Sequence, residues 1–284
     1  MPLCNLSQCL SGLPPEAAVG CFSVYNLESL LAVVAAAEAE GRPAVVSLDK
    51  HDLGHGKFGP LAHAALFMAR KADVPLAVHL NHGRTLNGIR EALELGLPSV
   101  MFDGSSLAME ENVRLTREAG ELAHEAGELA HEAGELAHEA GAEIEGEYGP
   151  LLVQAEDLPP VLDFLERTKV DFLAFSVPKG LPHSAYAERI FLLAELSVRT
   201  SVPLVLHGAS RLSEDLLRQA LRSGVCKVNV HTEILRTLAR GIEKGQSRDA
   251  AKNPLVWLET AVEEVQNMVR ERIQLYHSGT LFPS

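Results

Sequence analysis

Short apolar runs recur along the chain, and each is followed by a longer stretch in which apolar residues return every three or four positions. Runs of the first kind are typical of buried β-strands, and stretches of the second kind are typical of amphipathic helices. The apolar runs predict strands at Val19–Ser23, Ala44–Asp49, Leu76–Leu80, Ser99–Phe102, Glu143–Glu147, Phe172–Ser176, Leu204–His207 and Cys226–Val230. The periodic stretches predict helices at Leu27–Glu40, Leu61–Lys71, Leu86–Leu95, Glu110–Ala140, Leu158–Arg167, Ala185–Thr200, Glu214–Ser223, Glu233–Ile242 and Pro254–Gln274.

This alternation of strands and helices favours an α/β fold, a (β/α)₈ TIM barrel that forms one domain over residues 1–284. An open, doubly wound parallel sheet is the alternative. No GxGxxG turn follows the first predicted strand, which argues against a dinucleotide-binding version of that alternative.

A tandem repeat lies in the helix that follows the fourth strand. The heptapeptide AGELAHE occurs three times over residues 119–139, and Ala126, Leu129, Ala133 and Leu136 form a stripe at heptad spacing. Two extra copies lengthen a helix by roughly 21 Å while nearly restoring its phase. We expect a solvated extension of a barrel helix; a partner-binding helix is the alternative.

The overall charge limits the class of partner. The chain carries 38 acidic and 25 basic residues, a net charge of −13, which argues against a broad nucleic-acid surface. A small phosphorylated substrate remains compatible, because a local cluster of N–H groups can bind a phosphate. No apolar run reaches membrane-spanning length, and the four cysteines show no CxxC spacing, so we expect a cytoplasmic protein with reduced thiols.

Polar residues stand at the carboxyl end of every predicted strand. In TIM barrels these ends form the active-site face, so the side chains are expected to converge on one mouth, although each alone is also a common turn former. They are Ser23, Asp49, Asn81 with His82, Asp103, Glu147, Ser176, His207 and Asn229. Three histidines, His82, His183 and His207, could face that mouth, and three imidazoles leave an open position on a metal ion.

Three long segments carry a family resemblance. They are CFSVYNLESLLAVVAAAEAEGRPAVV, VHLNHGRTLNGIREALELGLPSVMFDGSSLAMEENVRLTREA and VPLVLHGASRLSEDLLRQALRSGVCKVNVHTEI. They resemble the class II, metal-dependent aldolases that act on fructose bisphosphate and tagatose bisphosphate. The resemblance implies an aldehyde-lyase of carbohydrate metabolism, such as glycolysis, which cleaves a ketose bisphosphate to dihydroxyacetone phosphate and an aldehyde. It also implies a homodimer or homotetramer.

The resemblance assigns roles by position. It implies that His82, His183 and His207 bind a catalytic Zn²⁺, with Asp103 and Glu147 beside the metal and a second cation position possible. The substrate and its phosphate would lie against Ser23, Asp49, Gly208, Ser210, Asn229 and Thr232.

Several positions depart from the family pattern. Asn81 stands where the family has an aspartate that carries a proton, and an amide cannot accept and return one. The family's longer glycine-rich loop after the fifth strand is replaced by a short segment, in which Glu156 or Asp157 could supply an acid. His231 replaces a small residue beside the phosphate loop, and Asp49 and Ser23 also differ. We therefore expect a retained metal and phosphate site with weakened or altered aldol chemistry, in which Asp49 or His231 could move protons.

Two other functions stay open at this point. One is a sugar-phosphate-binding or regulatory protein, and the other is a different phosphosugar enzyme on the same barrel. A metal-free Schiff-base mechanism needs a lysine at a strand end, for which Lys50 and Lys179 are the candidates.

Overall fold

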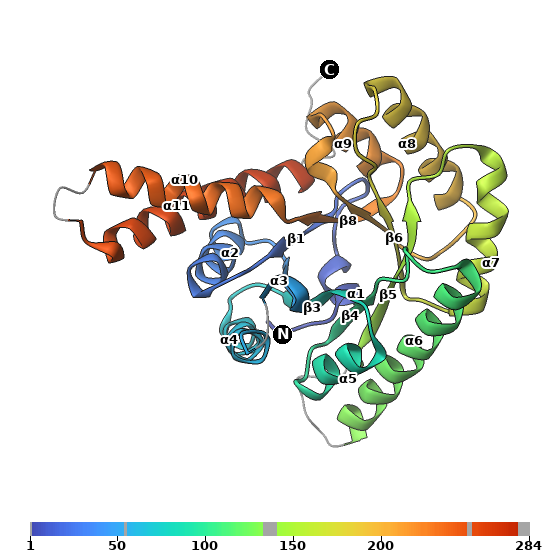
Figure 1. Cartoon of the computed structure of the whole chain (residues 1–284), viewed down its shortest axis with the longest axis horizontal. Coiled ribbons are helices and arrows are strands. Elements are labelled where there is room, and N and C mark those ends of the chain that lie inside the picture. Colours follow the sequence, from blue (N-terminus) through green and yellow to red (C-terminus); the bar gives the residue numbers. More distant parts are fainter. Residues whose placement is uncertain (1, 54–55, 133–140, 249–251, 278–284) are drawn as a thin grey trace.

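The chain forms a closed barrel of eight parallel strands, in the order β1 to β8, surrounded by helices (Figure 1). The computed structural model describes residues 2–53, 56–132, 141–248 and 252–277. The strands are β1 (Val19–Ser23), β2 (Ala44–Asp49), β3 (Leu76–Gly83), β4 (Ser99–Phe102), β5 (Glu143–Pro150), β6 (Phe172–Ser176), β7 (Leu204–His207) and β8 (Val225–Val230). The predicted TIM barrel is confirmed, and the open-sheet alternative is wrong because β1 also pairs with β8.

The helices lie close to their predicted positions, although the helix after β8 runs past its predicted end at Ile242, and residues 133–140, predicted as helix, lie outside the described part of the chain. The helices are α2 (Leu27–Glu40), α4 (Phe58–Lys71), α5 (Leu86–Glu94), α6 (Met109–Glu132), α7 (Leu158–Thr168), α8 (His183–Ser197), α9 (Glu214–Arg222), α10 (Thr232–Arg248) and α11 (Pro254–His277). Two short helices, α1 (Leu6–Leu10) and α3 (Lys50–Leu53), escaped prediction because five and four residues are too few to show a period. The hairpin of α10 and α11 extends beyond the barrel (Figure 1), and Gly241 allows its two helices to approach closely at Ala261.

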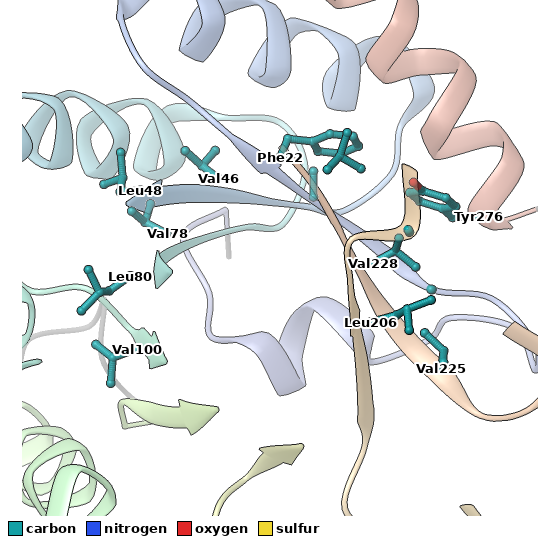
Figure 2. Packing of buried hydrophobic residues seen from close by; sticks show 14 of the residues in the cluster. Phe22, Val46, Leu48, Val78, Leu80, Val100, Leu206, Val225, Val228 and Tyr276 are labelled. Carbon is teal, nitrogen blue, oxygen red and sulfur yellow. The ribbon is translucent and has the colours of Figure 1, made fainter. Parts of the chain in front are cut away.

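The two faces of each strand have different partners because successive side chains in a strand alternate in direction. Figure 2 shows Val46 and Leu48 of β2 and Val78 and Leu80 of β3 in the buried cluster that packs beneath the surrounding helices. A second cluster fills the barrel at the amino ends of the strands, where α1 contributes Leu6. Toward the carboxyl ends the interior becomes polar, and this gradient positions the site.

The first copy of the repeat packs on the barrel instead of projecting into solvent. Ala119, Ala123 and Gly127 are buried, and a Cβ on Gly127 would lie 2.5 Å from the Gly141 Cα, so the chain returns to α6 at this point. His124 is half-exposed, and its Nε2 lies 3.0 Å from the Asp171 carboxylate. Of the predicted stripe, Ala126 is half-buried, and the side chains of Leu129, Ala133 and Leu136 lie outside the described residues.

The described helices include none that is both long and apolar enough to cross a lipid bilayer.

Candidate metal centre and substrate cavity

The polar strand ends gather at one mouth of the barrel, as the sequence predicts. A cavity of about 260 Å³ opens there. It is lined by Ser23, Asp49, Asp52, Asn81, His82, Arg84, His207, Gly208, Ser210, Arg211, Asn229, His231 and Thr232. The ends of β4, β5 and β6 adjoin this cavity. Asp103 and Glu147 both contact His82, and Ser176 donates a hydrogen bond to Glu147.

An irregularity at the end of β3 turns His82 toward this mouth. Leu80 pairs with Val100, but Gly83 pairs with Phe102, so β3 holds one more residue than β4 over this interval. His82 adopts a left-handed backbone with φ of 47°, which is uncommon for a residue with a side chain and often occurs at functional sites. A regular strand would direct Asn81 and His82 to opposite faces. The extra residue and the turn at His82 bring both to the cavity.

His82, Glu147 and His207 form a three-residue group suited to a metal ion. Each offers one ligand atom, and these atoms lie within 4.8 Å of one another. Two buried polar atoms of the group, Glu147 Oε2 and His207 Nδ1, have no hydrogen-bond partner in the described structure. Buried polar atoms are almost always paired, so their isolation needs an explanation. A divalent cation would satisfy both, and two imidazoles with one carboxylate are the ligands of some catalytic zinc sites.

A carboxylate orients the first of these imidazoles. His82 Nδ1 lies 2.9 Å from Asp103 Oδ2 and 3.6 Å from Glu147 Oε2. Burial alone would lower the pKa of His82, but the Asp103 hydrogen bond and the nearby Glu147 carboxylate raise it above its ordinary value. Burial likewise opposes ionisation of Asp103, yet hydrogen bonds from His82 and Ser105 hold its pKa below the usual range. Asp103 is therefore an ionised partner of the ligand, the usual arrangement behind metal-bound histidines.

Glu147 is more deeply buried than His82 and Asp103. Its pKa is raised, first by burial and then by the Asp103 charge, while His207 acts in the opposite direction. A cation between Glu147 and the two imidazoles would reverse this preference and keep the carboxylate charged. The group thus has the donor types, the proximity and the missing charge that a divalent ion supplies.

The comparisons with known proteins agree with this geometry. The family model described as "Fructose-bisphosphate aldolase class-II" matches residues 14–280. This chain belongs to that family. It is 33% identical over 266 residues to the Escherichia coli protein YdjI, with 92% of each chain covered. It is also 33% identical to the D-tagatose-1,6-bisphosphate aldolase subunit GatY of Klebsiella oxytoca, with 91% of each covered.

Solved structures support the same placement. The crystal structure of the Escherichia coli YdjI aldolase matches with a TM-score of 0.75 and 30% identity over 92% of both chains. Fructose-bisphosphate aldolase of Campylobacter jejuni matches with the same TM-score at 16% identity, which shows the shared barrel alone.

Within this aldolase barrel, His183 does not join the other two histidines. It is the exposed first residue of α8, and its Nε2 lies 3.5 Å from the Ser213 hydroxyl. Glu147 takes the third place in the group of described residues that could hold a metal. The sequence could not separate the two, because His183 belongs to a connecting segment whose path no strand pattern fixes, whereas Glu147 lies on β5.

The positions that the resemblance assigns to substrate line the cavity, with differing surroundings. Ser23, Asn81 and Asn229 form its buried wall, while Ser210 and Thr232 stand at its exposed rim. Position 208 favours glycine because its backbone is left-handed, with φ of 70°, and a side chain there would also meet the guanidinium of Arg211. Asp49 also has a local task, since its Oδ1 accepts from the backbone N–H of His51 at 2.8 Å and so begins α3.

His231 lies between two side chains at the rim. The Tyr25 hydroxyl lies 3.1 Å from His231 Nδ1, and the Asp52 carboxylate lies 3.1 Å from Nε2. Burial lowers the pKa of His231, and the negative charge of Asp52 opposes that effect. A neutral imidazole can donate from Nε2 to Asp52 and accept at Nδ1 from Tyr25. The departure from the family pattern at this position is therefore an oriented histidine.

The acidic residues of the shortened loop do not reach the metal group. Asp157 accepts from the backbone N–H groups of Val153 and Gln154, at 2.9 and 3.2 Å, and Glu156 stands beside it in a short 3₁₀ turn. The structure thus gives Asp157 a local role after β5.

The lysines proposed for Schiff-base chemistry have other surroundings. Lys50 forms an ion pair with Glu91, and Lys179 lies exposed on the segment between β6 and α8.

The sequence analysis missed several residues near the cavity, among them Asp52, which lines it. Arg84 and Arg211 add positive charge to its wall, and Glu145 and Lys227 lie fully buried beneath it. A signal for the buried pair exists in the sequence, since β5 reads Glu-Ile-Glu-Gly-Glu and β8 reads Lys-Val-Asn, each with a polar residue at every second position. That alternation marks a polar inner face.

Proposed function

We propose that this chain catalyses the reversible cleavage of a phosphorylated ketose to dihydroxyacetone phosphate and an aldehyde, with Zn²⁺ as the catalytic metal. The observation that carries the proposal is the group of His82, Glu147 and His207, with its two unpartnered buried atoms, at the active face of an aldolase-family barrel. The relatives named as tagatose- and fructose-bisphosphate aldolases support the reaction class.

The residues at the cavity have two roles in this proposal, which are to hold the metal and to attract an anionic substrate. His82, His207 and Glu147 would hold the metal, with Glu147 in place of His183 as third ligand; a second cation position near Asp103 stays a prediction. When bound, the metal acts as a Lewis acid that lowers the energy of negative charge on the substrate oxygens. The cationic side chains of Arg84 and Arg211 favour an anionic substrate.

The phosphate group of the substrate has a matching rim. Gly208, Ser210, Asn229 and Thr232 follow the seventh and eighth strands, where TIM barrels commonly bind phosphate. Thr232 is the first residue of α10, whose free backbone N–H groups suit an anion.

Proton transfer must differ from the family pattern at Asn81. Its Oδ1 already accepts from Asn229 Nδ2 at 3.1 Å, so its own amide N–H groups remain for a substrate oxygen. We assign the exchange of a proton with the aldehyde oxygen to His231, because an imidazole can both give and take a proton near neutral pH; the substrate oxygen would have to replace Tyr25 or Asp52 at one ring nitrogen. Asp49 stays the alternative, with its Oδ1 engaged in capping α3.

The decisive experiment follows the shared half-reaction, which needs no knowledge of the aldehyde. Dihydroxyacetone phosphate is incubated in D₂O with the Zn²⁺-loaded protein, and proton NMR follows loss of a hydrogen from its hydroxymethyl carbon. We expect exchange with the loaded protein and none after chelation. His231→Gln is expected to keep this exchange and to slow cleavage of the full substrate by about 10²–10⁴-fold.

A coupled cleavage assay on fructose and tagatose 1,6-bisphosphates, with Asn81→Asp alongside, addresses the substrate. Exchange without cleavage of either sugar indicates an aldolase for a different aldehyde. Binding of dihydroxyacetone phosphate without exchange indicates the sugar-phosphate-binding protein instead and refutes the proposed activity. Cleavage by the unaltered chain at the rate of ordinary aldolases refutes weakened chemistry at Asn81.

Three further expectations stay predictions: a homodimer or homotetramer, a cytoplasmic location and a role in glycolysis. Sedimentation velocity tests the first of these directly.

A further inference from the structure

A buried ion pair lies directly beneath the cavity. Lys227 of β8 donates to Glu145 Oε2 of β5 at 2.8 Å, and both side chains are fully buried. Burying two charges is unfavourable unless their surroundings compensate. Two apolar residues in place of a buried ion pair often give a protein that is equally stable or more stable. Neither residue lines the cavity, so the pair calls for a role other than direct contact with substrate.

The geometry identifies an ion pair, because an ammonium and a carboxylate lie 2.8 Å apart with both side chains fully buried, where either charge alone would lack a compensating partner. His79 adds no competing charge, because burial lowers its pKa and its Nδ1 pairs with the Ser99 hydroxyl at 2.8 Å.

The ammonium group fixes the direction of one chain of hydrogen bonds. An ammonium only donates, so the atoms that face Lys227 must be acceptors. One of them is Asn229 Oδ1, at 2.9 Å, and this turns the Asn229 amide nitrogen toward Asn81. Asn229 Nδ2 then donates to Asn81 Oδ1 at 3.1 Å, which leaves the Asn81 amide nitrogen for the cavity.

The Glu145 carboxylate fixes the direction of a second series of hydrogen bonds. Glu145 Oε1 lies 2.9 Å from His207 Nε2, and Asn229 Nδ2 lies 3.1 Å from the same atom. A hydrogen bond to an ionised carboxylate is roughly twice as strong as one between neutral groups, so Nε2 carries the hydrogen and donates to Glu145. The other nitrogen of His207, Nδ1, then holds a lone pair, and it is one of the two unpartnered atoms of the metal group.

We propose that Lys227 and Glu145 are positioning residues, which set the tautomer of His207 and the orientation of the Asn81 amide. His207 thereby presents a lone pair to the divalent cation, and Asn81 presents N–H donors to the substrate. The inference rests on the proposed function in taking that cation as the catalytic metal. It also defines the substrate: the oxygen that meets Asn81 is an acceptor, such as a carbonyl, carboxylate or developing alkoxide.

The first experiment compares Glu145→Gln with Glu143→Gln, two identical changes on one strand. Glu143 is also a buried carboxylate of β5, but its Oε2 accepts from the backbone N–H of Ser7 at 3.1 Å, far along the strand from the cavity. Competition with a chromophoric chelator gives the Zn²⁺ dissociation constant of each protein. Loss of a partner behind a metal ligand typically weakens binding by about 10–100-fold, which we expect for Glu145→Gln. Glu143→Gln is expected to stay within about threefold of the unaltered protein, below that range.

The second experiment reads the tautomer without metal or turnover. In protein labelled with ¹⁵N-histidine, the ring nitrogens of His207 are assigned by their loss in His207→Gln. We expect a protonated Nε2 and a bare Nδ1 in the unaltered chain, and a mixture of tautomers in Glu145→Gln. Should that variant not fold, Lys227→Met combined with Glu145→Gln leaves no unpaired buried charge, and the same two shifts are expected there.

Two results would overturn the inference. One is a folded variant, lacking the pair, that binds Zn²⁺ as tightly as the unaltered chain. The other is a His207 ring that carries its hydrogen on Nδ1. Failure of the proposed aldol function is a separate outcome, because it appears as absent deuterium exchange on dihydroxyacetone phosphate while these two readouts stay as expected.

Discussion

Gly83, next to His82, offers a sharp test of how the barrel wall builds the site. A Cβ at this position would lie 2.6 Å from the backbone oxygen of Met101 and 2.7 Å from Ile89 Cδ1. The Met101 oxygen belongs to β4 and cannot rotate away, so Gly83→Ala must push β3 and β4 apart. The backbone N–H of Asp103 donates to the Gly83 oxygen at 2.8 Å, so the same displacement separates His82 from Asp103.

The size of the effect follows from these distances. Forcing an extra carbon into a packed interior costs about 1–3 kcal/mol of unfolding free energy. An unfolding entropy near 2.1 cal/mol/K per residue gives about 0.6 kcal/mol/K for a chain of this length, so the melting temperature should fall by about 2–5 °C. Zn²⁺ affinity should fall as well, since outer-shell partners of metal ligands are worth about 10–100-fold.

Gly59→Ala is the matched control. A Cβ on Gly59 meets nothing within 4 Å, and the residue lies in the first turn of α4. Replacing a helical glycine with alanine gains up to about 0.5–1 kcal/mol, so this variant should melt at or above the temperature of the unaltered chain. Differential scanning calorimetry and the chelator competition measure both effects. If Gly83→Ala melts and binds Zn²⁺ like the unaltered chain, the close packing at the β3 irregularity does not position His82.

Three further outcomes are expected. His183→Ala should leave Zn²⁺ affinity within about threefold, whereas His207→Ala should lower it by more than about 100-fold, and equal losses in the chelator assay would return His183 to the ligand set. Replacing residues 128–140 with a short Gly-Ser linker should shift the melting temperature by only a few degrees, because Gly127 and Gly141 lie side by side and loop length has a weak effect on stability; unfolding of that variant would contradict this. Asp171 raises the pKa of His124 through a hydrogen bond, so this contact stabilises the protein below pH of about 6.5 and is lost as the pH rises through the folded pKa. Urea unfolding of His124→Ala should therefore show a small deficit at pH 5.5 that disappears at pH 8.5, and a deficit that does not change with pH would refute the pairing.

The barrel could be predicted from the order of residues alone, because a buried strand leaves a local run of apolar residues. Five of the eight strands have the predicted bounds and β8 begins one residue earlier than predicted, while β3 and β5 extend three residues further. Site residues lie in these extensions, since β3 continues through Asn81, His82 and Gly83. The sequence pattern predicts a turn at these polar residues, because the end of a strand at the barrel mouth lacks the apolar side chains by which a buried strand is recognised.

Which of the polar residues meet depends on how the barrel closes, and this could not be predicted from the sequence. Glu147 ends the predicted fifth strand and His183 follows the sixth, yet closure of the barrel places Glu147 beside His82 and leaves His183 at the start of α8. The pairing of Glu145 with Lys227 joins strands that lie 82 residues apart. Such contacts depend on strand register and on the angle at which a closed cylinder directs its inner side chains, and neither quantity is written in a local stretch of sequence.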